Sequence, residues 1–498
     1  MILAHGRPFR APHWYERAVR LCGAQLLHTI DTNDATNPMV VVCGKSGSGK
    51  SGAQLFHCDD AISARMSWIE IDPHGKGARD CIRLAMRRGY DPRDALIIDP
   101  GNPYTSQRSP QLALLELGPN EQPFEPVGRV VSAFKAIVKE GLMDRGLDIL
   151  RQCCFTCIDA GLSIAEIPLL LTDQEFREAV VARVTRPDLR AFWGQFARFR
   201  AEQFANFVES VRNKLSAFFA NAHIRNMLSA TTSTFDFYDL MRAGKVVIIR
   251  LSEATFDPTT RRLAVALIME KIKQAVMRRH DDPESACYPT AIFVDEAHEV
   301  WHSDAIMPLL GSGRKLRVAL HLYFHTLDQL DPIEAQVLLG TASNLLAFAC
   351  SRRTAEFMAK EMISVSGTRV KYQERDFWGP KGRPQFYSTT EEFEHVIGQM
   401  MRQERQQCFA YSISRQGKSL PYFASIPDID YPKEDEIAEA KFYRRSAEHY
   451  GRSITDIEEE ERRRRAAVVA PEPPRVRLIA RQPTATQVLV RERASRWE

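Results

Sequence analysis

Residues 39–51 read Met-Val-Val-Val-Cys-Gly-Lys-Ser-Gly-Ser-Gly-Lys-Ser, an apolar run followed by a glycine-rich turn that ends in Lys50 and Ser51. The turn fits the pattern G-x-x-x-x-G-K-[ST], and the run before it is typical of a strand buried on both faces. Glycines let the backbone wrap closely around phosphates, and the helix expected after the turn adds partial positive charge at its N-terminus. The stretch therefore predicts a phosphate-binding loop (Walker A) in an α/β fold, rather than an accidental glycine-rich turn.

Each residue type in this loop has an expected role. Lys50 would reach the β- and γ-phosphates of ATP, and the hydroxyl of Ser51 would bind Mg²⁺. Backbone amides would cradle the phosphates. The nucleotide-binding residues expected in the loop are Gly44, Lys45, Ser46, Gly47, Ser48, Gly49, Lys50 and Ser51.

A second apolar run, Ala291–Val294, ends in Asp295 and Glu296. Asp295 (Walker B) is expected to hold Mg²⁺ through water at the carboxyl end of its strand, where ligands bind in open α/β sheets. Glu296 is expected to orient or deprotonate the attacking water, the alternative being a plain surface carboxylate. The acidic pair favours a hydrolase over a kinase.

His298 completes the letters Asp-Glu-Ala-His, which also occur in DEAH-box helicases. In those helicases a Ser-Ala-Thr motif follows the box, whereas here residues 229–231 carry these letters ahead of it. We therefore exclude that helicase class and interpret His298 as a residue that begins a helix and faces solvent or the nucleotide.

Further apolar runs alternate with helical patterns along the chain, and this alternation predicts a mostly parallel central sheet covered by helices. The runs expected as strands, besides 39–43 and 291–294, are 68–71, 95–98, 246–251, 318–324, 345–348 and a C-terminal pair at 408–414 and 420–426. The expected fold is a RecA-like P-loop NTPase. Its expected divisions are an unassigned segment 1–36, a nucleotide-binding domain 37–124 and 240–430, an all-α insertion 125–239, and a charged helix with a flexible basic tail 431–498.

The composition argues against a wholly disordered or fibrous protein and against a membrane-spanning helix. The 498 residues include 44% hydrophobic and 26% charged residues, as in ordinary globular proteins, and no run of 18 apolar residues is present. Ten cysteines are too few for a disulfide scaffold, so we expect a reduced, cytoplasmic compartment. Of the net charge of +4, six arginines and three glutamates in 471–498 contribute +3, so any polyanion must bind a local patch.

The chain resembles the HerA–FtsK superfamily of P-loop motors over residues 39–426, and within it the conjugative DNA-transfer (type IV secretion coupling) ATPases. The segments that carry the resemblance are Asp72-Pro73-His74-Gly75, the helical insertion with Phe192-Trp193 and Arg212–Leu215, the return segment 235–248, and Gly313-Arg314-Lys315.

This resemblance implies a ring, usually a hexamer, that binds ATP and Mg²⁺ between subunits and translocates DNA. It implies that Arg314 is an arginine finger for a neighbouring subunit, with Arg317 as the alternative. His325 stands where the family usually has a glutamine that senses the γ-phosphate, and a buried structural histidine is the alternative reading.

The partners follow from the same resemblance. Coupling proteins usually begin with membrane helices, which this sequence lacks. One expectation is therefore a membrane or secretion-channel partner, and the other is that the protein acts in the cytosol. Export of protein or assembly of a channel is the alternative function, and a slowly hydrolysing nucleotide switch is a third. The candidates for contacts with DNA phosphates are Lys76, Arg79, Arg212, Lys214 and Arg225. The alternative for each is an ordinary surface side chain in contact with water.

Overall fold

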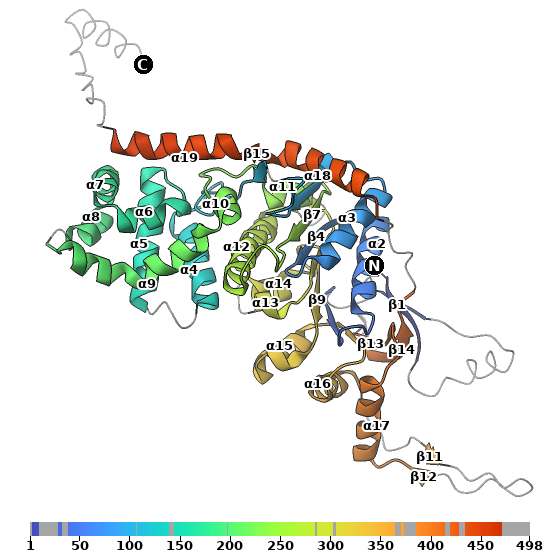
Figure 1. The fold of residues 1–498 in the computed structure, drawn as a ribbon. Coiled ribbons are helices and arrows are strands. Elements are labelled where there is room, and N and C mark those ends of the chain that lie inside the picture. The colour runs from blue at the N-terminus through green and yellow to red at the C-terminus, as the bar shows by residue number, and fades with distance from the viewer. Residues whose placement is uncertain are drawn as a thin grey trace, which may run out of the picture.

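A computed structural model describes residues 2–8, 28–31, 38–105, 107–138, 144–196, 198–283, 286–301, 305–363, 370–372, 385–413, 419–427 and 434–470. A large twisted sheet lies beside a group of helices, and the last two helices of the described chain run along them, one over the sheet part and one over the helices (Figure 1). The basic tail beyond residue 470 lies outside the described residues.

Seven parallel strands form the centre of an 11-stranded sheet. In spatial order they are β10 (Asn344–Ala347), β3 (Val40–Cys43), β9 (Val318–Phe324), β8 (Thr290–Val294), β4 (Ser67–Asp72), β7 (Val246–Arg250) and β5 (Ala95–Ile98). The α/β fold with a mostly parallel sheet is therefore confirmed. Cys43 lies opposite Phe324, and Ile71 lies opposite Val294, so the loops that follow β3, β9, β8 and β4 meet at one edge.

Antiparallel strands extend the sheet beyond β10. They are β13 (Gln407–Ile413), β14 (Ser419–Ser425), β1 (Ile2–Pro8) and β2 (His28–Asp31). The C-terminal strand pair agrees with the prediction to within one residue, while its connection 415–418 lies outside the described residues. Both β1 and β2 fall in the segment for which the sequence suggested no fold.

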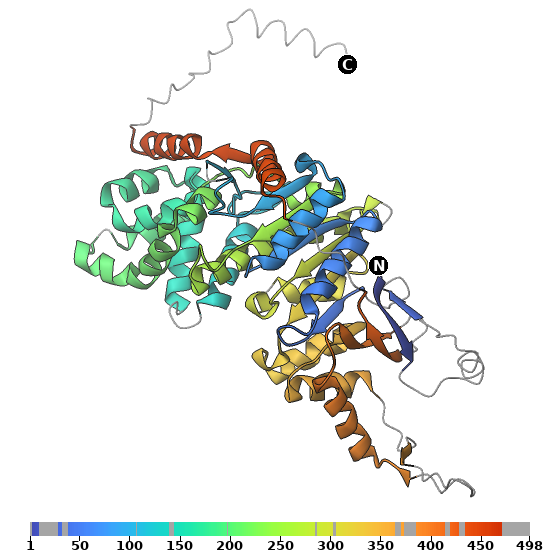
Figure 2. The same ribbon diagram turned by 45° about the vertical axis from the view of Figure 1, so that its right-hand side comes forward.

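Helices cover both faces of the sheet (Figure 2). One layer contains α2 (Lys50–Ser63), α3 (Lys76–Arg87) and α18 (Glu436–Tyr450), and the other contains α12 (Pro258–Met277), α14 (Ile306–Ser312) and α16 (Arg352–Met362). Val40 and Val42 pack in the first layer, whereas Val41 packs in the second. Since side chains alternate across a strand, a strand covered on both faces reads as an uninterrupted apolar run.

Between residues 124 and 242 the described chain contains helices joined by turns and no strand, and we call this part the helical block. Its helices are α4 (Phe124–Ile137), α5 (Asp144–Ala160), α6 (Ile167–Thr172), α7 (Gln174–Arg183), α8 (Pro187–Gly194), α9 (Ala201–Ala220), α10 (Ala222–Leu228) and α11 (Phe237–Arg242). Helix α4 packs against α12, which covers the central sheet, so one apolar core continues from the helical block to the sheet. The division into domains at 125 and 239 stays a prediction.

No single helix in the described ranges has the length and apolar character needed to cross a bilayer. The sharply bent pair 144–160 and 164–172 meets that test only when its halves are taken together. Several of its side chains, including Leu150, Cys154 and Leu170, are at most 2% exposed in the core of the helical block.

The C-terminal helices form a strap across the molecule. After α18, the short strand β15 (Gly451–Ser453) pairs with β6 (Arg108–Pro110), and α19 (Ile454–Val469) then runs along the helical block (Figure 1). The acidic–basic run 458–465 lies in α19 and belongs to the charged helix expected within 431–498. Arg464 donates hydrogen bonds to Glu166, which is fully buried, and to the carbonyl of Ser229.

The remaining elements surround the edge where the site lies or extend from it. They are α13 (His298–Trp301), α15 (Pro332–Thr341), α17 (Thr389–Met401) and a separate two-stranded ribbon of β11 (Val370–Tyr372) and β12 (Gln385–Phe386).

Candidate nucleotide-binding site

The glycine-rich loop joins β3 to α2 and depends on glycine at defined points. Gly47 has φ 79° and Gly49, which precedes α2, has φ 111°, both in the region that favours glycine. A Cβ atom on Gly44 would lie 2.5 Å from Ser48 Oγ and 2.8 Å from Phe348 Cβ. The turn is therefore packed too closely for side chains at its first position.

Backbone hydrogen bonds anchor the loop to its neighbours. Lys45 donates its amide to the carbonyl of Ala349 at 2.7 Å, just after β10. On the other side, Gln406 donates its amide to the carbonyl of Ser48 at 2.9 Å. A Cβ on Gly49 would lie 2.8 Å from the nitrogen of Gln406, so the segment before β13 rests directly on the loop.

Lys50, the first residue of α2, reaches the acidic pair that follows β8. Its Nζ lies 3.0 Å from Glu296 Oε1 and 3.9 Å from Asp295 Oδ1. The side chains of Lys50 and Glu296 are 6% and 3% exposed, so Glu296 is not the surface carboxylate of the alternative reading. Two segments that are 246 residues apart in sequence thus form one buried cationic–anionic cluster.

The backbone at Glu296 is strained. Its φ of 45° lies in the left-handed region, where a non-glycine residue costs about 1–3 kcal/mol. Asp295 donates its amide to the carbonyl of Ile71 and accepts the amide of Glu296 on its own carboxylate, 2.9 and 3.0 Å apart. These bonds hold the turn that presents both carboxylates at the sheet edge.

The two carboxylates have opposite electrostatic environments. Burial raises the pKa of the Asp295 carboxyl to about 6, despite the opposing effect of Lys50. Burial also disfavours ionisation of Glu296, but His298, Lys50 and His325 together hold its pKa at about 2. Glu296 is therefore a carboxylate at neutral pH, as a proton acceptor must be.

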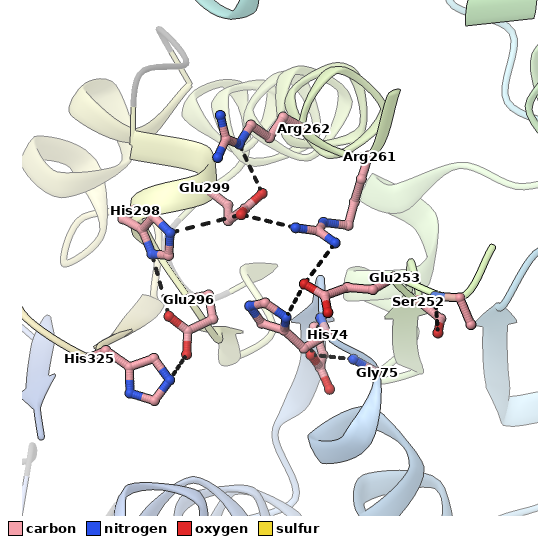
Figure 3. A network of polar contacts seen from close by, with 12 residues as sticks. His74, Gly75, Ser252, Glu253, Arg261, Arg262, Glu296, His298, Glu299 and His325 are labelled. Carbon is pink, nitrogen blue, oxygen red and sulfur yellow. Dashed lines mark hydrogen bonds and ion pairs between the residues drawn. The ribbon is translucent and has the colours of Figure 1, made fainter. Parts of the chain in front are cut away.

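Two histidines flank Glu296 (Figure 3). His325, directly after β9, places Nε2 2.8 Å from Glu296 Oε1, and its side chain is 43% exposed, which excludes the buried structural reading. Burial, followed by the charge of Lys50, lowers the pKa of His325. His298 begins α13 as expected, yet its Nδ1 lies 3.4 Å from Glu296 Oε2, a contact that no local pattern indicated.

The donor set suits Mg²⁺, which prefers oxygen ligands. Ser51 is exposed in the first turn of α2, and the Asp295 carboxylate is 15% exposed beside Lys50. Ser48 Oγ is buried and has no hydrogen-bond partner among the described residues, so the loop offers a polar atom that a phosphate could satisfy. Ser51 and Asp295 are the residues that could hold the ion.

Other predicted residues lie farther away. Arg314 is exposed in the turn before β9, at the end of that strand opposite to His325. Seven strand residues separate the two ends, about 20 Å at the usual rise. Arg317 donates instead to the carbonyl of Cys287 at 3.2 Å. Arg314 is thus too far from the loop of its own chain to contact a nucleotide bound there.

The predicted DNA contacts are dispersed. Arg79 is paired with the buried carboxylate of Glu439 at 3.2 Å, so it has a structural partner already. Lys76 and Lys214 are exposed on α3 and α9, while Arg212 and Arg225 are half-buried. Together they do not define a single basic patch.

Comparisons with known proteins agree with this geometry. A family model described as "Type IV secretory system Conjugative DNA transfer" matches residues 177–362, which include the acidic pair, Arg314 and His325. No curated protein matches the chain.

Solved structures share the fold over most of the chain. The bacterial conjugative coupling protein TrwB, in its unbound form, matches with a TM-score of 0.53 and 14% identity, covering 87% of this chain and 96% of its own. TrwB in complex with ADP and Mg²⁺ matches with a TM-score of 0.51, 16% identity, and coverage of 87% and 95%. VirB4 of Thermoanaerobacter pseudethanolicus matches with a TM-score of 0.51, 15% identity, and coverage of 83% and 95%. The resemblance of this chain to the conjugative DNA-transfer ATPases of the HerA–FtsK superfamily is therefore confirmed by its fold and by the sequence of residues 177–362.

Proposed function

We propose that the chain is an ATPase that translocates DNA during conjugative transfer and works as a ring, usually a hexamer in the proteins it resembles. The observation that carries the ATPase is the approach of Lys50 Nζ to within 3.0 Å of Glu296 and 3.9 Å of Asp295. The choice of DNA as the moved polymer is supported by the family match over 177–362. The TrwB structure in complex with ADP and Mg²⁺ supports the same ligands here.

The residues of the cluster divide the chemistry between them. Lys50 exchanges its bond with Glu296 for one with phosphate oxygens, because a γ-phosphate carries more charge than one carboxylate. Glu296, freed on one side and ionised at neutral pH, accepts the proton of the attacking water. His325 donates from Nε2 to Glu296 and takes the place of the usual glutamine as sensor of the γ-phosphate. Mg²⁺, held by Ser51 and through water by Asp295, would neutralise charge on the phosphates.

Arg314 completes the site of the next subunit in this proposal. A guanidinium matches the charge spread over the transferring phosphoryl group, and Arg314 lies about a strand length from its own loop. An exposed arginine at the opposite edge of the sheet suits a contact across an interface.

The test is an ATPase assay with Mg²⁺ in which duplex DNA is titrated at several salt concentrations. We expect DNA to raise the turnover rate, with an apparent affinity that falls steeply as salt increases, because phosphate contacts release counterions. Lys50→Ala serves as the inactive control. A rate that responds to a polypeptide substrate instead would favour protein export, and a rate that stays low with DNA, polypeptide and high protein concentration would indicate a nucleotide switch.

A further inference from the structure

Polar side chains continue from Glu296 toward helix α12 (Figure 3). Glu296 Oε2 lies 3.4 Å from His298 Nδ1, and His298 Nε2 lies 3.8 Å from Glu299 Oε1. Glu299 then accepts from Arg261 Nη2 at 3.1 Å and from Arg262 Nε at 3.3 Å. Within the described part of the chain, neither Glu296 Oε2 nor His298 Nδ1 has a hydrogen-bond partner, and the 3.4 Å approach is the contact that joins these two buried atoms.

The ion pair farthest from Glu296 in this network, formed by Arg261 and Glu299, is deeply buried. The side chains of Arg261 and Glu299 are both 4% exposed. Desolvating two charges costs several kcal/mol per ion, and an apolar pair of similar volume is often at least as stable. The pair is therefore poorly explained as a stabilising device, and its position one residue away from His298 offers another explanation.

Arg261 also links two further parts of the site. Its Nη1 lies 3.1 Å from Glu253 Oε1, and the same oxygen lies 2.8 Å from Nδ1 of His74, in the turn after β4. Helix α12, which carries Arg261, packs against α4 of the helical block. The guanidinium thus ties the acidic turn after β8 to the turn after β4 and to the helix that contacts the block.

We propose that Arg261 and Glu299 are positioning residues for Glu296, and that they act through His298. The proposal rests on the ATPase function proposed above. Glu299 orients the imidazole of His298, as a carboxylate commonly orients a functional histidine, and His298 then holds Oε2 of Glu296. When Lys50 moves to phosphate, Oε1 loses one of its two partners, so the contact at Oε2 decides where the carboxylate points.

The experiment removes both charges together. In the double variant Arg261→Met/Glu299→Leu no unpaired charge is left in the interior, so the fold is retained while the support of His298 is lost. The matched control is Glu270→Leu/Lys273→Met, which removes another pair on α12, 2.6 Å apart, with Glu270 2% exposed. Steady-state ATPase rates, KM for ATP, the Kd for a fluorescent ATP analogue and the melting temperature are measured for both and for the unmodified protein.

We expect kcat of the Arg261→Met/Glu299→Leu protein to fall at least tenfold, with KM and Kd within twofold of the unmodified values. The control should keep kcat within twofold. A test variant that keeps kcat within twofold, or loses kcat and nucleotide affinity alike, would overturn the positioning role while leaving the ATPase intact. An unmodified protein without ATPase activity would overturn the proposed function and this inference with it.

Discussion

The substitution Asp295→Asn should stabilise the protein while it abolishes Mg²⁺-dependent turnover. Asp295 stands at the carboxyl end of β8, and its side chain is only 15% exposed. Among the described residues its ion-pair partner is Lys50, which lies at 3.9 Å and is shared with Glu296 at 3.0 Å. The surroundings of Asp295 therefore disfavour the ionised form of its carboxyl group.

The size of the effect follows from the pKa of Asp295, which burial raises from 3.8 to about 6. A shift of about two units corresponds to about 3 kcal/mol. This shift already includes the attraction to Lys50, so we expect a gain of about 2–3 kcal/mol in the free energy of unfolding at pH 7.5. An amide oxygen can still accept the backbone N–H of Glu296, so the turn is retained.

The pH dependence has a definite sign. Because the pKa is raised on folding, the folded state binds the proton more tightly between about pH 4 and pH 6, and stability from this group is lost as pH rises through that window. Above pH 6 the penalty is constant. The advantage of Asp295→Asn should therefore be small near pH 4 and complete by pH 7.

Chemical denaturation with a chelator present, from pH 4.5 to 7.5, measures this advantage directly. Addition of Mg²⁺ and ATP should then stabilise the unmodified protein more than the variant, because only the former has the carboxylate that supports the ion. If Asp295→Asn lowers the free energy of unfolding by more than 1 kcal/mol at pH 7.5, the account of this carboxylate as electrostatically strained is wrong.

Three further predictions test the rest of the site. Glu296→Gln should keep nucleotide bound but lower kcat by about 10²–10⁴, the usual range for a lost general base, and equal turnover would remove this residue from the mechanism. Mixing Arg314→Ala chains with Lys50→Ala chains should restore part of the ATPase activity, since a mixed interface pairs an intact loop with an intact arginine; no recovery at any ratio would argue against a role in trans. Gly49→Ala should destabilise the protein by at least about 2 kcal/mol more than Gly47→Ala, because both have positive φ but only the former places Cβ 2.8 Å from a backbone nitrogen, and similar unfolding midpoints would contradict this.

The sequence predicted what depends on local pattern. The parallel strands were evident because burial on both faces leaves runs such as Val40–Cys43 without polar residues. Lys50 and Asp295 were assigned to one site because each follows such a run, and parallel strands bring their carboxyl ends to one edge. Their roles remain predictions, but their placement together is observed.

What the sequence did not indicate depends on distances across the fold. Neither β1 nor β2 has a continuous apolar run, since both lie at the antiparallel margin of the sheet. The contact of Glu299 with Arg261 joins α13 to α12 across 38 residues and has no local signal. The charged run 458–465 gave no local sign of a buried contact, because Glu166, the partner of Arg464, lies 298 residues away in sequence.

The strap formed by β15 and α19 has a consequence for movement. Strand β15 pairs with β6, which precedes the helical block in sequence. Arg464 of α19 donates hydrogen bonds to Glu166 and Ser229 of the helical block. A hinge between the two parts cannot open without breaking these bonds, so in the proposed motor the two parts would move as one body. Truncation after residue 453 would remove the contacts of Arg464 while it leaves α18 on the sheet, so the link between the two parts would then rest on the packing of α4 against α12.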